Sequence, residues 1–112
     1  MKVSIIGAGA VGATTAFTLA KTSFVDEIAI VDIDQNRAKG NALDILHGLS
    51  LMHETRIVSG DYDCAINSDV IVITVGVPEK VGESRLVPLQ KNVKILQDII
   101  PKITSTSPNG LL

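Results

Sequence analysis

The sequence is poor in aromatic residues and in cysteine. It has no tryptophan, one tyrosine and two phenylalanines among 112 residues. Three aromatic rings are too few for the stacking surface on which single-stranded nucleic acid binds. The single cysteine, Cys64, excludes an intrachain disulfide and lies outside any C-x-x-C motif. We therefore interpret Cys64 as a small core residue rather than a reactive thiol.

The sequence also lacks an excess of one charge and any long apolar run. Ten Lys and Arg are scattered among twelve Asp and Glu, for a formal net charge of −2, which argues against a nucleic-acid surface. No apolar run approaches the roughly 20 residues that span a bilayer, and no signal peptide precedes the first predicted strand. We expect a cytoplasmic protein with neither nucleic acid nor membrane as a partner.

No cluster of His, Cys, Asp or Glu has the spacing of metal ligands, so no metal site is predicted. His47 is placed in a predicted helix and His53 just after it, and neither stands at the sequence spacing of a catalytic histidine–carboxylate pair. We expect both histidines to have surface or helix-end roles.

The most informative stretch is KVSIIGAGAVG, residues 2–12. Val3, Ile5 and Ile6 are nearly continuous β-branched residues, typical of a strand buried on both faces of a parallel sheet. The glycines that follow have the G-x-G-x-x-G spacing, and a helical pattern of small and apolar residues comes next. Strand, glycine turn and helix stand in the order of a dinucleotide-binding crevice.

Each glycine of this motif has a predicted role. Gly7 allows a sharp turn out of the strand, and Gly9 lacks the Cβ that would hold a pyrophosphate away from the backbone. Gly12 lets the helix lie close to the strand. The first helical amides, at about Ala10, Val11 and Gly12, lack intrahelical acceptors at the positive end of the helix dipole, and they suit a phosphate pair.

Asp32 adds the second part of the dinucleotide fingerprint. It ends the apolar run Ile28–Val31 and lies 20 residues beyond Gly12, where an acid accepts hydrogen bonds from the adenosine ribose. An acid there repels a 2′-phosphate and favours NAD over NADP, although Arg37 nearby weakens this inference. The alternative is that Asp32 only caps a helix, a role that Asp34 can also fill as the N-cap of the next helix.

Strands and helices alternate along the rest of the chain. Pro88 is compatible with the first turn of the last helix, whereas Pro101 is expected to kink or interrupt its final turns. We expect strands at residues 28–31, 55–59 and 69–75, a turn or single helical turn at 61–67, and helices at about 11–22, 35–52 and 85–103. On the second helix the buried side is predicted to include Ala38, Ala42, Leu43, Ile45 and Leu46.

This alternation predicts an α/β fold, a Rossmann-type doubly wound parallel sheet with strand order 3-2-1-4-5-6. Leu111 and Leu112 resemble the first residues of a fifth strand, so the sheet is expected to be truncated there. Strand 4 would then be left as an unpaired edge. We therefore expect residues 1–112 to be an incomplete NAD-binding domain of a longer enzyme, with the catalytic domain absent from this chain.

Four segments, in order, resemble the lactate/malate dehydrogenase family: GAGAVGATTAFTLA, IVDIDQNRAKGNALDILHG, ITVGVPEKVGESR and LQKNVKILQDIIPKI followed by SPNG. The resemblance covers essentially the whole chain, and it is closest to the L-lactate dehydrogenases. It implies NAD as cofactor, with contacts from Gly7, Gly9, Ala10, Val11, Gly12, Asp32, Arg37, Gly76, Val77 and Asn92.

The resemblance also implies a mobile loop over residues 76–85 that closes on the substrate. Arg85 matches the catalytic arginine that polarises the substrate carbonyl, where a guanidinium stabilises the developing negative charge. The alternative is that Arg85 is an ordinary solvated residue, but a cation at a helix start is slightly unfavourable, which favours a functional role.

Glu79, the other expected substrate-binding residue, departs from the family pattern. Six residues before the loop arginine, lactate-type members carry glutamine and malate-type members arginine. A carboxylate pointing inward would repel the second carboxylate of oxaloacetate, and it leaves open a neutral, polar or cationic side group on the 2-oxo acid. Alternatively, Glu79 is solvated on an open loop and has no effect on the choice of substrate.

The resemblance implies the cofactor part of an NAD-dependent L-2-hydroxy acid dehydrogenase, most simply one that interconverts pyruvate and L-lactate. Malate or a bulkier 2-hydroxy acid is the alternative substrate, and an NAD-binding module without catalysis is the alternative function. The catalytic histidine, its aspartate partner and the arginine that binds the substrate carboxylate come from later segments in this family. We therefore expect the fragment alone to be inactive and the full-length protein to be a homo-oligomer, a dimer or a tetramer.

Overall fold

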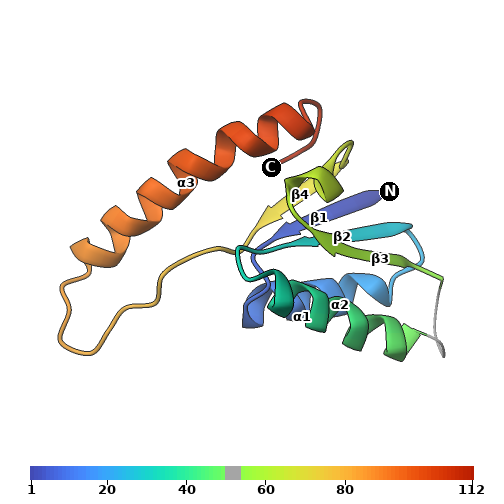
Figure 1. Cartoon of the computed structure of the whole chain (residues 1–112), viewed down its shortest axis with the longest axis horizontal. Coiled ribbons are helices and arrows are strands. Elements are labelled where there is room, and N and C mark those ends of the chain that lie inside the picture. The colour runs from blue at the N-terminus through green and yellow to red at the C-terminus, as the bar shows by residue number, and fades with distance from the viewer. Residues whose placement is uncertain (50–53) are drawn as a thin grey trace.

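The computed structural model describes residues 1–49 and 54–112 (Figure 1). The last residues of the predicted second helix and His53 lie outside the described residues. The elements are β1 (Lys2–Ile6), α1 (Ala10–Ala20), β2 (Glu27–Val31), α2 (Gln35–Leu49), β3 (Arg56–Gly60), the 3₁₀ helix η1 (Tyr62–Ala65), β4 (Val70–Ile73) and α3 (Leu86–Thr106).

The four strands form one parallel sheet in the order β3-β2-β1-β4, which confirms the predicted doubly wound arrangement. In this register Ile5 of β1 lies between Ile30 of β2 and Val72 of β4. β1 and β2 are the central strands, and four of the five residues in each are buried. Their β-branched sequences suit a strand covered on both faces, which explains why the apolar runs were informative.

The helices cover the two faces of the sheet, α1 and α2 on one and η1 with α3 on the other (Figure 1). Alternate residues of β1 serve the two layers. Val3 and Ile5 belong to the core beneath α1 and α2, whereas Ile6 packs in a second core with Ile99 and Ile103 of α3. Because side chains of a strand alternate between faces, one strand joins both cores.

The helix α2 buries a narrower stripe than predicted. Ala38, Ala42 and Ile45 are buried as expected, but Leu43 and Leu46 are 43% and 46% exposed. The prediction that these two leucines are buried is therefore wrong. The residues facing the sheet follow one helical row of spacings of three and four, and positions 43 and 46 lie beside that row on the outer surface.

The long helix α3 continues through Pro101 to Thr106. Of the two expected effects of Pro101, a kink or an interruption, the interruption is wrong. The missing amide of Pro101 would have bonded the carbonyl of Gln97, an exposed residue whose carbonyl can be hydrated instead. Beyond the proline, the Thr104 hydroxyl donates to the Ile100 and Pro101 carbonyls at 3.0 and 3.1 Å. These bonds add to the helical hydrogen bonds of the last turns and do not replace the one lost at Gln97.

Leu111 lies beside β4 in a parallel bridge with Val70. The Ile71 amide donates to the Leu111 carbonyl at 2.8 Å, and the Leu111 amide donates to the Asp69 carbonyl at 2.9 Å. This placement agrees with a fifth strand beginning next to β4. Within the described ranges 1–49 and 54–112, no helix is both long enough and apolar enough to cross a membrane.

Candidate functional site

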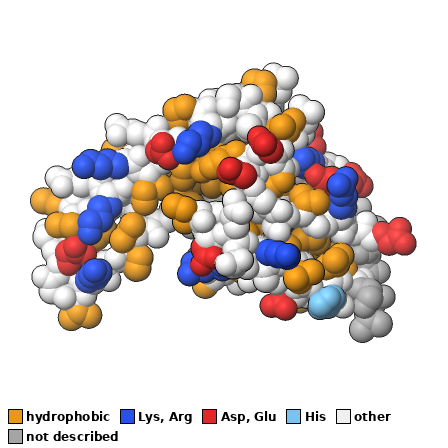
Figure 2. Space-filling model, viewed as in Figure 1, with side chains coloured by type: hydrophobic (Ala, Val, Ile, Leu, Met, Phe, Trp, Pro, Cys, Tyr) orange, Lys and Arg blue, Asp and Glu red, His pale blue; other side chains and the backbone are white. Residues whose placement is uncertain are grey.

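A cleft of about 740 Å³ lies at the carboxyl ends of β1, β2 and β4. This edge of an open parallel sheet, where the connections leave to opposite faces, is where ligands of α/β folds bind. Figure 2 shows hydrophobic side chains in the angle between the arm formed by α3 and the body of the molecule. The cleft is lined by Ile6, Gly7, Gly9, Val31, Asp32, Ile33, Gln35, Arg37, Asp61, Tyr62, Thr74, Val75, Gly76, Lys94, Ile95, Asp98, Ile99 and Lys102.

The turn between β1 and α1 requires glycine at two positions. Gly7 has φ +110°, which side chains rarely adopt, and a Cβ there would lie 2.9 Å from Thr74 Oγ1. A Cβ on Gly12 would lie 1.9 Å from the Gly7 carbonyl oxygen. The first glycine therefore makes the turn, and Gly12 permits the close contact between helix and strand end that we predicted.

Gly9 differs from these two, because nothing in the protein requires a glycine there. Its φ is −70°, and a Cβ would have no protein atom within 4 Å. Gly9 is the N-cap of α1 and accepts a hydrogen bond from the Ala13 amide at 2.9 Å. The amides of Ala10, Val11 and Gly12 precede that bond and have no acceptor within the helix. The space before Gly9 thus adjoins three amides that can bind an anion.

The Asp32 carboxylate binds the glycine turn directly. Its Oδ2 accepts from the Ala8 amide at 2.5 Å, and its Oδ1 accepts from the Asp34 amide at 2.8 Å. The Asn41 side chain completes the link by donating to the Ala8 carbonyl at 2.9 Å. Each carboxylate oxygen accepts more than one hydrogen bond, so Asp32 can hold the turn and still accept from a ligand in the cleft.

Asp34 caps α2, as predicted, because its side chain accepts from the Arg37 amide at 3.1 Å. The Arg37 side chain lines the cleft and lies 3.8 Å from the Asp34 carboxylate. Both side chains are about half exposed. The Arg37 guanidinium is thus partly neutralised by Asp34, which limits its attraction for a phosphate.

Three further predicted cofactor residues meet where β4 leads into the loop. Asn92 Oδ1 of α3 accepts from the Val77 amide at 2.8 Å. A Cβ on Gly76 would lie 3.8 Å from the same carboxamide. Gly76 lines the cleft, whereas Val77 and Asn92 do not. Asn92 therefore anchors the start of the loop and leaves its amide group able to donate.

The predicted substrate residues are not part of the cleft in this structure. Glu79 and Arg85 are exposed on the connection from β4 to α3, and neither lines the cleft. Arg85 is the N-cap residue of α3. Figure 1 shows this connection extending away from the sheet. The structure therefore brings Gly7, Gly9, Asp32, Arg37 and Gly76 together and leaves the loop residues apart.

The side of the cleft that η1 and α3 form was not predicted from the sequence. Lys102 Nζ lies 5.5 Å from the centre of the Tyr62 ring and donates to Asp98 at 2.7 Å. The bond to Asp98 raises the pKa of Lys102, and burial raises the pKa of Tyr62. The spacing of Ile95 and Ile99 on one helix face was the available signal, but the tyrosine is placed only by tertiary structure.

Within the part of the chain that the structure describes, no group of three or more His, Cys, Asp or Glu side chains is placed to hold a metal ion. His47, in the last turn of α2, is exposed and does not line the cleft.

Residues 1–112 match the family model described as lactate/malate dehydrogenase, NAD binding domain. The chain belongs to the lactate/malate dehydrogenase family. Its cofactor is NAD. The sequence is 46% identical over 111 residues to an L-lactate dehydrogenase of Clostridium perfringens and 41% identical to one of Clostridium botulinum. Each match covers 99% of this chain and 35% of the relative, so the chain spans about a third of these proteins' length.

Solved structures of this family have the same fold. Malate dehydrogenase from Archaeoglobus fulgidus, in complex with NADH, superposes with a TM-score of 0.90 and 40% identity over 98% of this chain and 38% of that one. A lactate dehydrogenase from a Medee basin deep-sea metagenome superposes with a TM-score of 0.86 and 34% identity, over 99% of this chain and 35% of that one. The Rossmann-type fold of a dehydrogenase predicted from the sequence is thus confirmed.

Proposed function

We propose that the chain is the NAD-binding domain of a longer L-2-hydroxy acid dehydrogenase, with pyruvate and L-lactate as its substrate pair. The observation that carries the proposal is Asp32, which faces the cleft while bound to the glycine turn at Ala8. The curated relatives named L-lactate dehydrogenase support the choice of reaction.

In this proposal the chain's residues bind and orient the cofactor. The amides of Ala10, Val11 and Gly12 bind the pyrophosphate, with the space before Gly9 left clear for it. Asp32 accepts from the adenosine ribose, and Arg37 flanks the adenosine side. Gly76, Val77 and Asn92 lie along the nicotinamide ribose. When bound, NAD exchanges a hydride with C2 of the acid.

The loop of residues 76–85 supplies the substrate side. Reduction of a 2-oxo acid places negative charge on the former carbonyl oxygen, and the Arg85 guanidinium stabilises that charge when the loop covers the cleft. The proton is exchanged with a histidine outside this chain. Because that group lies elsewhere, we propose that residues 1–112 alone bind NAD and catalyse nothing.

Glu79 determines the choice among 2-oxo acids in this proposal. Its carboxylate repels the second carboxylate of oxaloacetate, which favours pyruvate. The malate dehydrogenase of Archaeoglobus fulgidus, 40% identical and similar in fold, favours malate as the second candidate. A bulkier 2-oxo acid remains a third. The full-length protein is proposed to be a cytoplasmic homo-oligomer, a dimer or tetramer, with no nucleic-acid or membrane partner.

Steady-state kinetics of the full-length enzyme with NADH tests the proposal, with pyruvate, oxaloacetate and branched 2-oxo acids as substrates. We expect the highest kcat/KM with pyruvate, and a Glu79→Gln variant is expected to gain activity with oxaloacetate. A clear preference of the wild-type enzyme for oxaloacetate would refute the role given to Glu79. Turnover of pyruvate by residues 1–112 alone would refute the proposal that this chain binds NAD without catalysing the reaction.

A further inference from the structure

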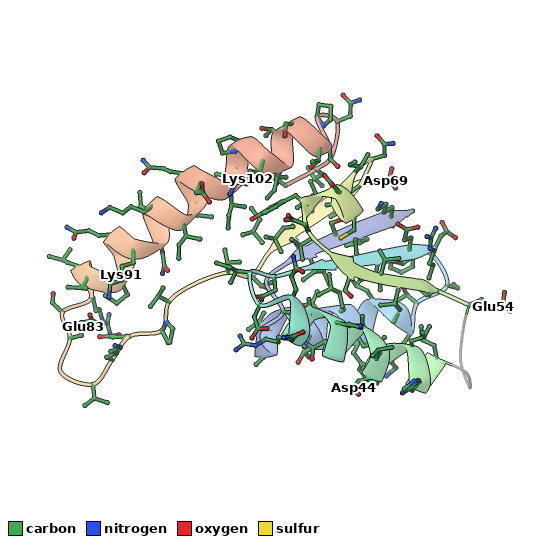
Figure 3. All side chains as sticks on the ribbon, viewed as in Figure 1. Asp44, Glu54, Asp69, Glu83, Lys91 and Lys102 are labelled. Atoms are coloured by element: carbon green, nitrogen blue, oxygen red, sulfur yellow. The ribbon has the colours of Figure 1, made fainter. Side chains whose placement is uncertain are left out.

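An ion pair joins the loop before α3 to the helix itself. Glu83 Oε1 lies 3.6 Å from Lys91 Nζ, and Figure 3 shows both residues at the N-terminal end of α3. The Glu83 side chain is only 21% exposed, compared with 49% for Lys91. The carboxylate is therefore better shielded from water than in most surface pairs, and the attraction is screened less.

The same carboxylate closes a turn at the tip of the loop. Glu83 Oε2 accepts from the Lys80 amide at 3.4 Å, and the Glu83 amide donates to the Lys80 carbonyl at 3.0 Å. Gly82, the third residue of this turn, has φ +83°, a conformation that glycine adopts readily. Residues 80–83 thus form a compact turn whose last side chain is bound to α3.

The other end of the loop is bound to the same part of the helix. The Val77 amide donates to Asn92, which follows Lys91 directly. Neighbouring helical residues therefore hold both ends of the loop. The Glu83–Lys91 pair links two residues that flank Arg85 in the sequence. The backbone at Arg85, the N-cap of α3, is therefore held in a fixed direction relative to the helix.

We propose that Glu83 is a positioning residue for Arg85. Its pair with Lys91 makes the loop and the first turns of α3 one unit, which covers the cleft without losing the orientation of the guanidinium. Without the ion pair, the loop and Arg85 would lose more conformational entropy each time the loop closes. This entropy cost would reduce the stabilisation of the transition state. This proposal rests on the proposed function of Arg85. The ion pair between Glu83 and Lys91 is observed in the structure whatever the function of Arg85.

The kinetic test uses Glu83→Gln, Lys91→Gln and the double variant in the full-length enzyme. Glutamine at position 83 can still accept from the Lys80 amide, so only the charge pair is removed. We expect kcat for the 2-oxo acid to fall about two- to fivefold, the range of a partly exposed pair, with the dissociation constant of NADH unchanged. The double variant is expected to be no slower than either single variant.

Arg56→Gln is the matched control. It removes a pair whose carboxylate has a similar exposure, 22% for Glu27, although Arg56 itself is 73% exposed. The pair joins Arg56 Nη1 to Glu27 Oε2 at 3.3 Å, at the opposite end of the sheet strands. This variant is expected to leave kcat unchanged. Additive losses in the double variant of positions 83 and 91, or a loss in NADH affinity that accounts for the slower rate, would overturn the proposal.

Hydrogen exchange provides a readout that does not depend on activity. In the full-length protein, amides of residues 76–85 are expected to exchange several-fold faster in Glu83→Gln and Lys91→Gln than in the wild type or Arg56→Gln. Unchanged exchange in both variants would overturn the proposal. If the wild-type enzyme reduces no 2-oxo acid, the proposed function fails, and the exchange data still decide whether the pair orders the loop.

Discussion

The carboxylate of Asp32 accepts a hydrogen bond from the amide of Ala8, 2.5 Å away, and so fastens the end of β2 to the glycine turn after β1. Ala8 is 2% exposed, so its amide cannot turn to water if the carboxylate is removed. The acid that the sequence predicts as the ribose acceptor therefore also has a structural role. Its two roles are separable only if stability and cofactor affinity are both measured.

Asp32→Ala is expected to lower the free energy of unfolding by about 2 kcal/mol, because a buried amide loses a charged acceptor. It is also expected to raise the dissociation constant of NADH by about tenfold or more, equivalent to ~1.4 kcal/mol. Urea unfolding and titration calorimetry on the full-length protein measure the two effects.

Asp34→Ala is the control for this prediction. Asp34 caps α2 from an exposed position and does not line the cleft, so its loss is expected to cost about 1 kcal/mol of stability without a comparable loss of NADH affinity. Equal affinity losses in the two variants would contradict the ribose role of Asp32.

The sequence was sufficient to predict the parts of the fold that depend on local pattern. Central strands such as Ile28–Val31 are apolar on both faces, and the glycine turn has fixed spacing, so both were placed correctly. Leu43 was misplaced because the buried row of a helix depends on where the sheet lies. Local composition cannot supply that direction.

The candidate site was predictable only where one segment contains the whole signal. Gly7 and Gly9 line the cleft, and Asp32 lies beside them, bound to the Ala8 amide. Tyr62 and Lys102 were missed because they come together from η1 and α3, which are 40 residues apart in the sequence. Arg85 was identified by the resemblance and by the unfavourable position of a cation at a helix start, but no short-range pattern encodes where its loop lies relative to the cleft.

Gly9→Ala separates cofactor binding from folding. Since a Cβ there meets no protein atom within 4 Å and φ is −70°, the midpoint of thermal unfolding is expected to stay within a degree or two, about 0.5 kcal/mol in free energy. NADH affinity is expected to fall about tenfold or more, because the methyl group occupies the space in front of the phosphate-binding amides. Unchanged affinity would place the pyrophosphate elsewhere.

Gly12→Ala is expected to have the opposite pattern. Its Cβ would lie 1.9 Å from the Gly7 carbonyl oxygen, so α1 must move off the strand end, at a cost of about 3 kcal/mol or more.

Gly40→Ala is the control for Gly12→Ala. Gly40 lies on the exposed side of α2 with open space around the new Cβ, so this variant is expected to stabilise the protein by about 0.5–1 kcal/mol. Chemical denaturation checks both, and a tolerated Gly12→Ala would contradict the close contact.

Cys64 is expected to react slowly with thiol reagents. Burial raises the pKa of its thiol above the ordinary value of 9.0, so little thiolate forms near neutral pH. Because the folded state holds this proton more tightly than the unfolded state, the contribution to stability is present below about pH 9 and is lost as the pH rises further. The rate of modification by a chromogenic disulfide, compared with free cysteine from pH 7 to 10, measures the shift. A rate equal to that of free cysteine at pH 7 would contradict it.

Arg85→Gln tests the role of the loop in the reaction. The side chain is exposed, lies outside the cleft and begins a helix, where a cation is slightly unfavourable, so its removal is not expected to destabilise the fold. In the full-length enzyme we expect kcat to fall by about 10²-fold, the loss typical of removing a group that stabilises an oxyanion. The dissociation constant of NADH is expected to stay unchanged, since the guanidinium acts on the substrate. Stopped-flow reduction of pyruvate and fluorescence titration of NADH provide the two numbers. A variant that retains its rate but binds NADH poorly would assign Arg85 to the cofactor instead.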